Sequence, residues 1–227
     1  MVIKTLDWDS LHFNTRIGSV QTAHLTQDQF EFIEKQSDNY DLVYAFSNSY
    51  DVALTKPINT KVYYLAHHSE LKHIHSNHIS EISNNQFDRI YDLSIVAGQH
   101  SRFKLDPLFD PKAYEMLYTK WVEKSFSPNH IVFGYIKDQT ILGMISLKFD
   151  SFSSVANIEL IGVDPDAQGM QVGTKLISAC VNYTKQNSNM NYLSVQTQKE
   201  NSLACKFYNK CGFKEQNSVN IHHIWTK

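Results

Sequence analysis

The sequence predicts an α/β fold in which helices pack against a mixed β-sheet. The chain has 227 residues, of which 42% are hydrophobic and 12% aromatic, so it can bury a substantial core. Segments with the apolar spacing of strands alternate with segments that have the spacing of helices. This alternation is typical of the α/β class. We expect an additional N-terminal α/β subdomain over residues 1–86 and a larger domain over residues 87–227.

The N-terminal subdomain is expected to contain short strands around one helix. Apolar and β-branched residues predict strands over residues 17–21, 42–46 and 61–66. A helix is expected to begin near Thr26, with Asp28 in its first turn. The order strand, helix, strand, strand therefore describes this part of the chain.

A polar, histidine-rich segment over residues 66–86 is the best candidate for the boundary between the two parts. Its histidines allow a metal-binding interpretation. No cluster of Cys or carboxylate residues accompanies them, and their spacing does not place two on one face of an obvious helix. A solvated loop without a metal is the favoured interpretation. The histidines are His67, His68, His73, His75 and His78.

The second part begins with two expected helices, over residues 90–99 and 112–126, of which the second is amphipathic. Two strands follow over residues 130–136 and 141–149, and the turn at residues 137–140 joins them as a hairpin. A strand, a loop, a helix, a strand, a helix and a last strand complete the chain.

The most informative local signal lies between a strand over residues 158–163 and a helix that begins near Gly173. Asp164 and Pro165 end the strand. The loop with Gly169 and Gly173 brings backbone N–H groups to a helix N-terminus, where the helix dipole favours an anion. The loop does not match G-x-G-x-x-G and lacks the Gly-Lys-Ser/Thr of a nucleotide P-loop. It indicates a cofactor that carries a pyrophosphate and is neither NAD nor ATP.

A second informative block follows nearer the C-terminus. Residues 192–197 alternate between apolar and polar, as a strand does. Asn201 is a natural N-cap for the next helix, and Gly212 lies where that helix would end in a left-handed residue. Residues 218–225 are expected to form the last strand.

These two blocks resemble the GNAT superfamily of acyl-CoA-dependent N-acyltransferases. Residues 163–173 resemble its V-x-P-x-x-[QR]-x-x-G-x-[GA] pyrophosphate loop, and residues 201–213 resemble its N-x-x-A-x-x-x-Y…G-F segment. The resemblance implies a GNAT catalytic domain over residues 87–227, with acetyl-CoA or another short-chain acyl-CoA as co-substrate and no metal. It implies a cofactor site formed by Ile161, Gly162, Val163, Gln168, Gly169, Met170, Gln171, Val172, Gly173, Thr174 and Asn201.

One residue of the loop departs from the family pattern, because Gln171 stands where a glycine is expected. Backbone amides donate hydrogen bonds whatever the side chain, so phosphate binding is retained if position 171 needs no positive φ. By resemblance, the backbone N–H groups of residues 161–163 bind the pantetheine arm and polarise the thioester carbonyl.

Tyr208 is the candidate general acid for the thiolate that leaves during N-acylation. A phenol with a pKa near ~10 is protonated at neutral pH and can donate to a thiolate whose conjugate acid has a pKa near ~8.5. A core tyrosine with a satisfied hydroxyl is the alternative. The family match at this position favours catalysis.

Two residues are candidates for the general base. Glu159, on the strand that enters the cofactor loop, can act through water, and a carboxylate with ordinary contacts at the sheet edge is the alternative. His100 is the second candidate. An amine with a pKa near ~8, as expected for an amino sugar, is already about a tenth neutral at pH 7, so a weak base is sufficient.

A narrower resemblance covers nearly the whole chain. Residues 8–14 look like the W-[DE]-[SN]-x-x-F opening of nucleotide-sugar N-acyltransferases similar to TDP-fucosamine acetyltransferase, and residues 100–103 resemble their S-R-F segment. This resemblance implies a dTDP-linked amino-dideoxysugar as acceptor, a role in lipopolysaccharide or O-antigen biosynthesis, and a homodimer. His100, Arg102 and Phe103 would then bind the substrate. Arg102 suits bidentate anion binding, and a solvated surface arginine is the alternative.

Composition limits the partners and the compartment. The formal net charge is −2 without a Lys/Arg cluster, so neither nucleic acid nor an anionic membrane is expected as the main partner. No run approaches the ~18 apolar residues of a membrane span, and the first residues lack the apolar stretch of a signal peptide. Three cysteines, an odd number, argue against a disulfide framework and fit a reducing cytosol. We therefore expect a cytoplasmic enzyme.

Three functional hypotheses remain open at this point. The favoured one is direct transfer of an acyl group from acyl-CoA to a nucleotide-linked amino sugar, without a covalent enzyme intermediate. The second is a GNAT enzyme that acts on a protein N-terminus or a lysine. The third is a catalytically silent sensor that binds acyl-CoA, which Gln171 supports and Tyr208 opposes.

Overall fold

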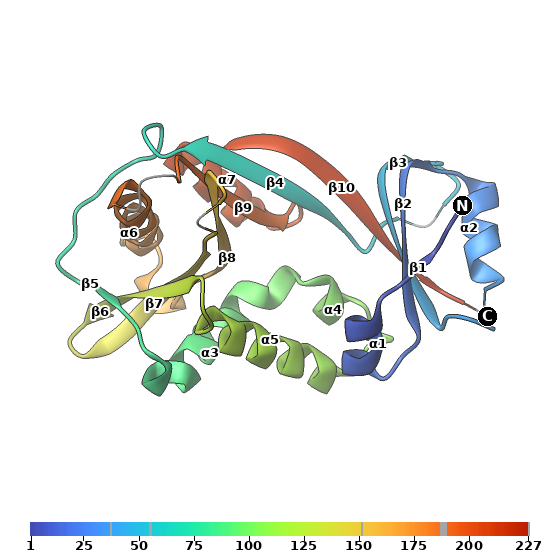
Figure 1. Ribbon diagram of the computed structural model, residues 1–227, viewed down its shortest axis with the longest axis horizontal. Coiled ribbons are helices and arrows are strands. Elements are labelled where there is room, and N and C mark those ends of the chain that lie inside the picture. The colour runs from blue at the N-terminus through green and yellow to red at the C-terminus, as the bar shows by residue number, and fades with distance from the viewer. Residues whose placement is uncertain (37, 55, 151, 187–189, 227) are drawn as a thin grey trace.

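The structure is a computed structural model, in which residues 1–36, 38–54, 56–150, 152–186 and 190–226 are described (Figure 1). The strands are β1 (Lys4–Thr5), β2 (Ile17–Leu25), β3 (Leu42–Tyr50), β4 (Asn59–His67), β5 (Ile79–Glu81), β6 (His130–Lys137), β7 (Thr140–Lys148), β8 (Val155–Val163), β9 (Tyr192–Gln198) and β10 (Lys214–Trp225). The α-helices are α1 (Asp7–Phe13), α2 (Gln27–Glu34), α3 (Phe87–Ala97), α4 (Arg102–Leu105), α5 (Pro111–Ser125), α6 (Val172–Gln186) and α7 (Ser202–Cys211).

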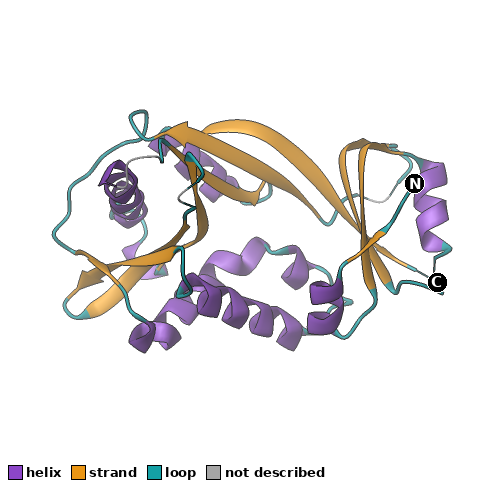
Figure 2. Ribbon diagram, viewed as in Figure 1, coloured by secondary structure: helices purple, strands orange, loops and turns teal. Residues whose placement is uncertain are grey.

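All of these strands join in one mixed sheet, whose order is β1-β2-β3-β10-β4-β9-β8-β7-β6-β5. The pairs β2–β3 and β8–β9 are parallel, and the other neighbours are antiparallel. The mixed α/β fold predicted from the sequence is confirmed. Strand β10 lies between β3 and β4 and so connects the N-terminal strands to the rest of the sheet (Figure 2). The division of the chain at residue 86 stays a prediction.

Helices cover both faces of the sheet in its second half. Helix α3 packs on β8 and β7, and α5 lies beside it on β6 and β7, while α6 packs on β6 and β7 from the other side. Met144 and Ile145, neighbours on β7, belong to two different core clusters, because successive strand residues point to opposite faces. Strands β4 and β10 extend over α4 toward the N-terminal strands (Figure 1). The candidate site is lined mainly by residues of β8, β9, α5, α6 and α7, together with Lys61 of β4.

Most expected elements are found close to their predicted bounds, and β10 and α3 begin earlier than expected. Strand β10 begins at Lys214 instead of residue 218, because the exposed polar residues 214–217 have no apolar alternation and are held by backbone pairing with β4. Helix α3 begins at Phe87, three residues before the expected start. The hairpin turn at residues 137–140 is present, with positive φ at Asp138 and Gln139.

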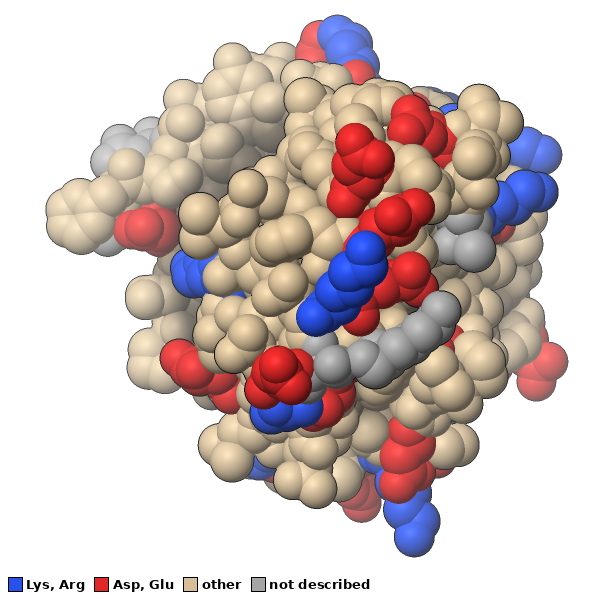
Figure 3. Space-filling view, turned by 90° about the vertical axis from the view of Figure 1, so that its right-hand side faces the viewer, with Lys and Arg blue, Asp and Glu red and all other residues tan. Residues whose placement is uncertain are grey.

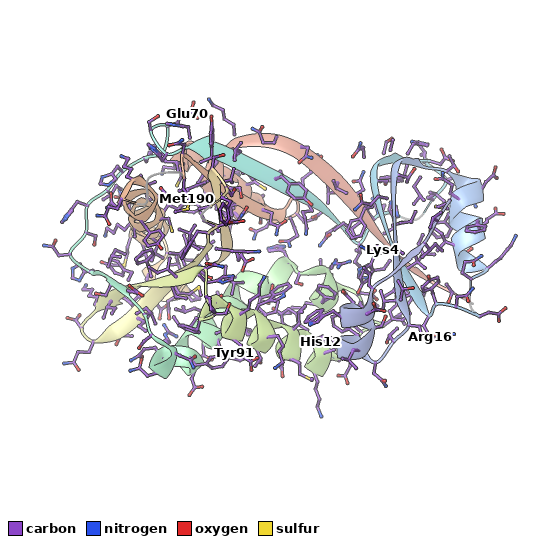
Figure 4. The ribbon with its side chains drawn as sticks, in the orientation of Figure 1. Lys4, His12, Arg16, Glu70, Tyr91 and Met190 are labelled. Carbon is purple, nitrogen blue, oxygen red and sulfur yellow. The ribbon has the colours of Figure 1, made fainter. Side chains whose placement is uncertain are left out.

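Helix α1 was not predicted as an element. Its first turn carries Asp7 and Asp9, which the helix dipole favours, and Asn14 ends it in the left-handed conformation with φ 48°. It packs beside α5, where Nε2 of His12 lies 3.4 Å from the carbonyl oxygen of Ala113 (Figure 4). Residues 8–14, which carry the W-[DE]-[SN]-x-x-F pattern, thus form a short helix on α5.

Candidate active site

Strands β8 and β9 lie side by side at their beginnings and then separate. Their parallel pairing covers Val155–Ile158 of β8 and Tyr192–Val195 of β9. Strand β8 continues to Val163 with β7 as its only recorded partner among the described residues. Its backbone edge toward β9 is therefore open from Glu159 onward, and backbone N–H and C=O groups there are available to a ligand.

A β-bulge marks the point of separation. Ser146 pairs with Leu160 and Leu147 pairs with Ile158, so Glu159 is an extra residue on β8. The extra residue reverses the alternation of the strand: Ile158 belongs to the core cluster beneath α6, and Leu160 belongs to the cluster beneath α3. Glu159 lines a cavity together with the C-terminal residues of β8 and β9.

The cofactor loop connects β8 to α6 through two residues with positive φ. Gly169 has φ 80° and Gln171 has φ 61°. The condition that position 171 needs no positive φ is therefore not met. The backbone requires the left-handed conformation that suits glycine, and the non-glycine residue there is strained by about 1–2 kcal/mol. The first-turn amides of Val172, Gly173 and Thr174 still lack acceptors within the helix, which is the feature that binds phosphate.

Gln171→Gly is expected to raise the free energy of unfolding by about 0.5–1 kcal/mol, the relieved strain less the extra backbone entropy of glycine. The Michaelis constant for acyl-CoA should fall, because the loop backbone becomes more accessible. Gln168→Gly is the matched control, since Gln168 has an extended backbone with φ −64° and loses stability on the same change. Chemical denaturation of both variants measures their free energies of unfolding. Destabilisation by Gln171→Gly would show that position 171 is not strained.

The cavity beside this loop has a volume of about 1030 Å³. It brings together most of the residues predicted from the sequence, from β8, the loop, α6, α7 and the turn before α4. Met170, Arg102 and Phe103 are outside its lining. The predicted residues that line it are His100, Glu159, Ile161, Gly162, Val163, Gln168, Gly169, Gln171, Val172, Gly173, Thr174, Asn201 and Tyr208.

Two glycines of the predicted cofactor site are required by packing. A Cβ on Gly162 would lie 2.3 Å from the carbonyl oxygen of Leu93, so the absence of a side chain lets α3 approach β8. A Cβ on Gly173 would lie 2.8 Å from Cζ of Phe207, which itself lines the cavity. Any side chain at position 173 would therefore displace the ring of Phe207 from the start of α6.

Gly173→Val is expected to raise the Michaelis constant for acyl-CoA strongly and to leave affinity for the acceptor nearly unchanged. The added side chain pushes Phe207 out of its place beside the first turn of α6, where the cofactor phosphates are expected. Steady-state kinetics with each substrate varied in turn tests this. Equal weakening of both substrates would instead indicate a folding defect.

Tyr208 lies on α7 with its ring buried and 4% of its surface exposed. Asn201 caps this helix by accepting a hydrogen bond from the backbone N–H of Ala204 at 3.1 Å. The ring contacts Tyr64, Phe207 and Phe213. Burial, followed by nearby Cys211, Cys205 and Tyr64, raises the pKa of Tyr208 above its usual value. The phenol is therefore protonated throughout the neutral range.

Glu159 lies between a cation and a histidine. Its Oε1 is 3.1 Å from Nζ of Lys124, and its Oε2 is 3.1 Å from Nε2 of His130. The carboxylate is 27% exposed and lines the cavity. It is thus accessible to water within the cavity, as a water-relayed base requires. His100, the other candidate base, also lines the cavity, at the end of the 3-10 turn Gly98–His100.

Arg102 is held in an aromatic cluster between α4 and the sheet. Its guanidinium carbon lies 3.9 Å from the ring centroid of Tyr44 and 4.4 Å from that of Phe103. Nη1 of Arg102 lies 3.2 Å from Nε2 of His223, and Nδ1 of His223 donates to Oδ2 of Asp106 at 2.5 Å. Burial is the main cause that lowers the pKa of His223 to about 4, so neutral His223 can accept from Arg102. The alternative of a solvated surface arginine is wrong.

Sequence reasoning missed the basic character of the cavity. Four lysines line it and Glu159 is the single carboxylate among the lining residues, although the whole chain has a net charge of −2. Acidic side chains gather instead at the end of the molecule that carries α2, with a few Lys and Arg between them (Figure 3). The lysines are far apart in the sequence, so no local cluster could reveal them. They are Lys61, Lys72, Lys124 and Lys210.

Among the described residues, no group of three or more His, Cys, Asp or Glu side chains is placed to hold a metal ion. The helices in the described ranges include none that is long and apolar enough to cross a membrane. Cys180, Cys205 and Cys211 are free thiols.

Comparison with known proteins identifies one family. The model of the acetyltransferase (GNAT) family matches residues 95–213, more than half of the chain. No curated relative matches the sequence.

Similar folds occur among solved structures. The alignment with a conserved protein of unknown function from Staphylococcus epidermidis covers 100% of this chain and 93% of that protein, with a TM-score of 0.66 and 12% sequence identity. The alignment with a tandem GNAT protein from the clavulanic acid biosynthesis pathway covers 86% of this chain and 66% of that protein, with a TM-score of 0.56 and 10% sequence identity. The alignment with a protein assigned to the GNAT family from Novosphingobium aromaticivorans covers 82% of this chain and 75% of that protein, with a TM-score of 0.52 and 10% sequence identity. At these identities the likeness is evidence of the fold alone.

Proposed function

The chain belongs to the acetyltransferase (GNAT) family and is a CoA-dependent acyltransferase of EC class 2.3.1, and we propose that its acceptor is a dTDP-linked amino-dideoxysugar. In this proposal an acetyl or related short acyl group moves directly to the sugar amine, in the cytoplasm, and the product feeds surface polysaccharide such as lipopolysaccharide or O-antigen. The homodimer implied by the resemblance stays an expectation, to be checked by light scattering.

The residues at the loop end of the cavity fit acyl-CoA. The first-turn amides of α6 can receive the pyrophosphate, and the open edge of β8 after Ile158 can hydrogen-bond the pantetheine arm. Lys72 and Lys210 both line the cavity. Burial raises the pKa of the nearby Cys211 thiol, and the charges of these two lysines act in the opposite direction. They are suited to further phosphate groups of the cofactor.

The proposed mechanism assigns one task to each residue of the cavity. Acyl-CoA, when bound, supplies the thioester carbonyl and the thiolate leaving group. Glu159, directly or through a water, accepts the proton that the sugar amine loses as its nitrogen bonds to the acyl carbon. The backbone N–H groups of residues 161–163 stabilise charge on the carbonyl oxygen. Tyr208 protonates the sulfur as the carbon–sulfur bond breaks, and solvent returns a proton to Tyr208.

The single observation that supports an anionic acceptor is the charge of the cavity. Both proposed substrates carry diphosphates, and four lysines with one carboxylate favour such ligands electrostatically. A protein N-terminus or a lysine, the alternative acceptors, would bring a cation into the same cavity. The sensor hypothesis is opposed by the position of Tyr208 in the lining, together with Glu159.

A substrate screen tests the proposal. Release of free CoA is measured with dTDP-3-amino and dTDP-4-amino sugars against a panel of acyl-CoAs, with peptides that offer a free N-terminus or a lysine as controls. We expect turnover with at least one nucleotide sugar and none with the peptides. Turnover with peptides alone would show that the acceptor is a protein N-terminus or a lysine. Absence of turnover with every acceptor would favour the hypothesis of a catalytically silent sensor.

A further inference from the structure

Lys61 lies on the same face of the sheet as the residues that hold Arg102. Residues paired across neighbouring strands share a face, as do alternate residues along one strand. Lys61 on β4 pairs with Gln198 on β9 and with Val219 on β10. His223 is four residues beyond Val219 on β10 and pairs with Tyr44 on β3. Lys61 and the cluster around Arg102 are therefore on one side of the sheet, above α4.

Lys61 is a half-buried cation without an anionic partner among the described residues. The structure records no ion pair or hydrogen bond for its ammonium group within the described ranges, and the nearest ring, Tyr63, has its centroid 6.0 Å away. Burial, and then the charge of nearby Arg102, lowers the pKa of Lys61 to about 8. A desolvated lysine beside a second cation is unfavourable unless an anion is bound between them. Its side chain lines the cavity, so an anion can reach it.

Arg102 is held in place but keeps N–H donors that are not used within the described residues. One of its five N–H donors is hydrogen-bonded, to Nε2 of His223. His223 is itself held by Asp106, which also accepts from Nε1 of Trp225 at 3.1 Å. The guanidinium is thus oriented before any ligand binds, and an oriented fork binds phosphate oxygens more tightly than a mobile side chain does.

We infer that Lys61 and Arg102 together form the anchor for the diphosphate of the acceptor. This inference rests on the proposed function and adds Lys61 as a specificity-determining residue. The diphosphate of acyl-CoA would then lie on the first turn of α6, and that of the nucleotide sugar would contact Lys61 in the cavity lining and extend beyond this lining to Arg102. The Asp106–His223 pair acts as a positioning element for Arg102.

The test is titration of dTDP, UDP and inorganic pyrophosphate into enzyme that is already saturated with CoA, so that the cofactor end is occupied. We expect Lys61→Met to weaken dTDP binding by about tenfold to hundredfold, and Lys61→Arg to retain most of it. CoA affinity and the melting temperature of Lys61→Met should not fall, because the charge that is removed is half-buried and has no anionic partner among the described residues. Lys199→Met is the matched control, since Lys199 is exposed just beyond β9 with its backbone N–H on the carbonyl of Thr60.

The outcomes separate this inference from the proposed function. Wild-type affinity for dTDP in Lys61→Met, or no binding of any probe to the wild type, overturns the anchor. If UDP or pyrophosphate binds in a Lys61-dependent way and dTDP does not bind, the diphosphate anchor is supported. The same result overturns the proposal that the acceptor is linked to dTDP. Should Lys61→Met lose CoA binding through misfolding, Lys61→Gln is measured by the same criteria.

Discussion

Tyr208→Phe is expected to lower kcat by about 10²–10⁴, the range of general acid catalysis, while both substrates still bind. The structure supports this expectation in two ways. The ring is packed in place by Tyr64, Phe207 and Phe213, so the phenylalanine retains the fold of α7. The hydroxyl has no protein hydrogen-bond partner in the part of the chain that is described, so its removal costs little stability.

The control for this variant is Tyr64→Phe. Tyr64 is buried beside Tyr208, with ring centroids 5.7 Å apart, but it does not line the cavity. Its hydroxyl interacts with Cys205 and Asn209, so its loss should lower the melting temperature and preserve turnover. If Tyr208→Phe shows that same pattern, the assignment of Tyr208 as the acid is wrong and a water or Glu159 becomes the proton source.

The pH profile gives an independent check on Tyr208. Burial, with smaller contributions from Cys211, Cys205 and Tyr64, raises the pKa of its phenol above 10, and the acid form is the active one. The active fraction is complete below the raised pKa and is lost only as the pH rises through it. Turnover of the wild type at saturating substrates should therefore not decline between pH 7 and pH 9.5 through ionisation of Tyr208. A decline that Tyr208→Phe abolishes would contradict the raised pKa.

The parts of the site that the sequence predicted are those with a local signal. Asn201 and Gly212 delimit α7 because a cap and a left-handed end each depend on a few neighbouring residues. The cofactor loop is similar, because Asp164 and Pro165 end β8 and a new apolar period begins at once with α6. Local patterns of this kind can be read from one segment without knowing its partners.

The remaining features depend on segments distant in the sequence. The bulge at Glu159 exists only relative to its pairing with β7. The position of Lys61 in the cavity depends on its register with Gln198 and Val219, more than a hundred residues away. The positive φ of Gln171 was also hidden, because glutamine gives no sign that the backbone requires a left-handed residue.

Arg102→Met is expected to weaken dTDP binding to the CoA-saturated enzyme by about 1.5–3 kcal/mol, which is a loss of roughly tenfold to hundredfold. Methionine replaces the aliphatic stem among the rings of Tyr44 and Phe103 without a charge, whereas alanine would leave a cavity there. CoA affinity should not change, because Arg102 lies outside the lining of the cavity at the cofactor loop. Isothermal titration with dTDP and with CoA measures both.

Two companion variants make the result specific to the guanidinium. Arg102→Lys keeps the charge but loses the planar contact with Tyr44 and the bond to His223, so it should recover only part of the affinity. Lys104→Met removes an exposed charge from the same helix, α4, and should have no effect on dTDP binding. A lower melting temperature with unchanged dTDP affinity in Arg102→Met would mean that Arg102 serves only to hold α4 on the sheet, because an anion anchor must lose affinity when its charge is removed.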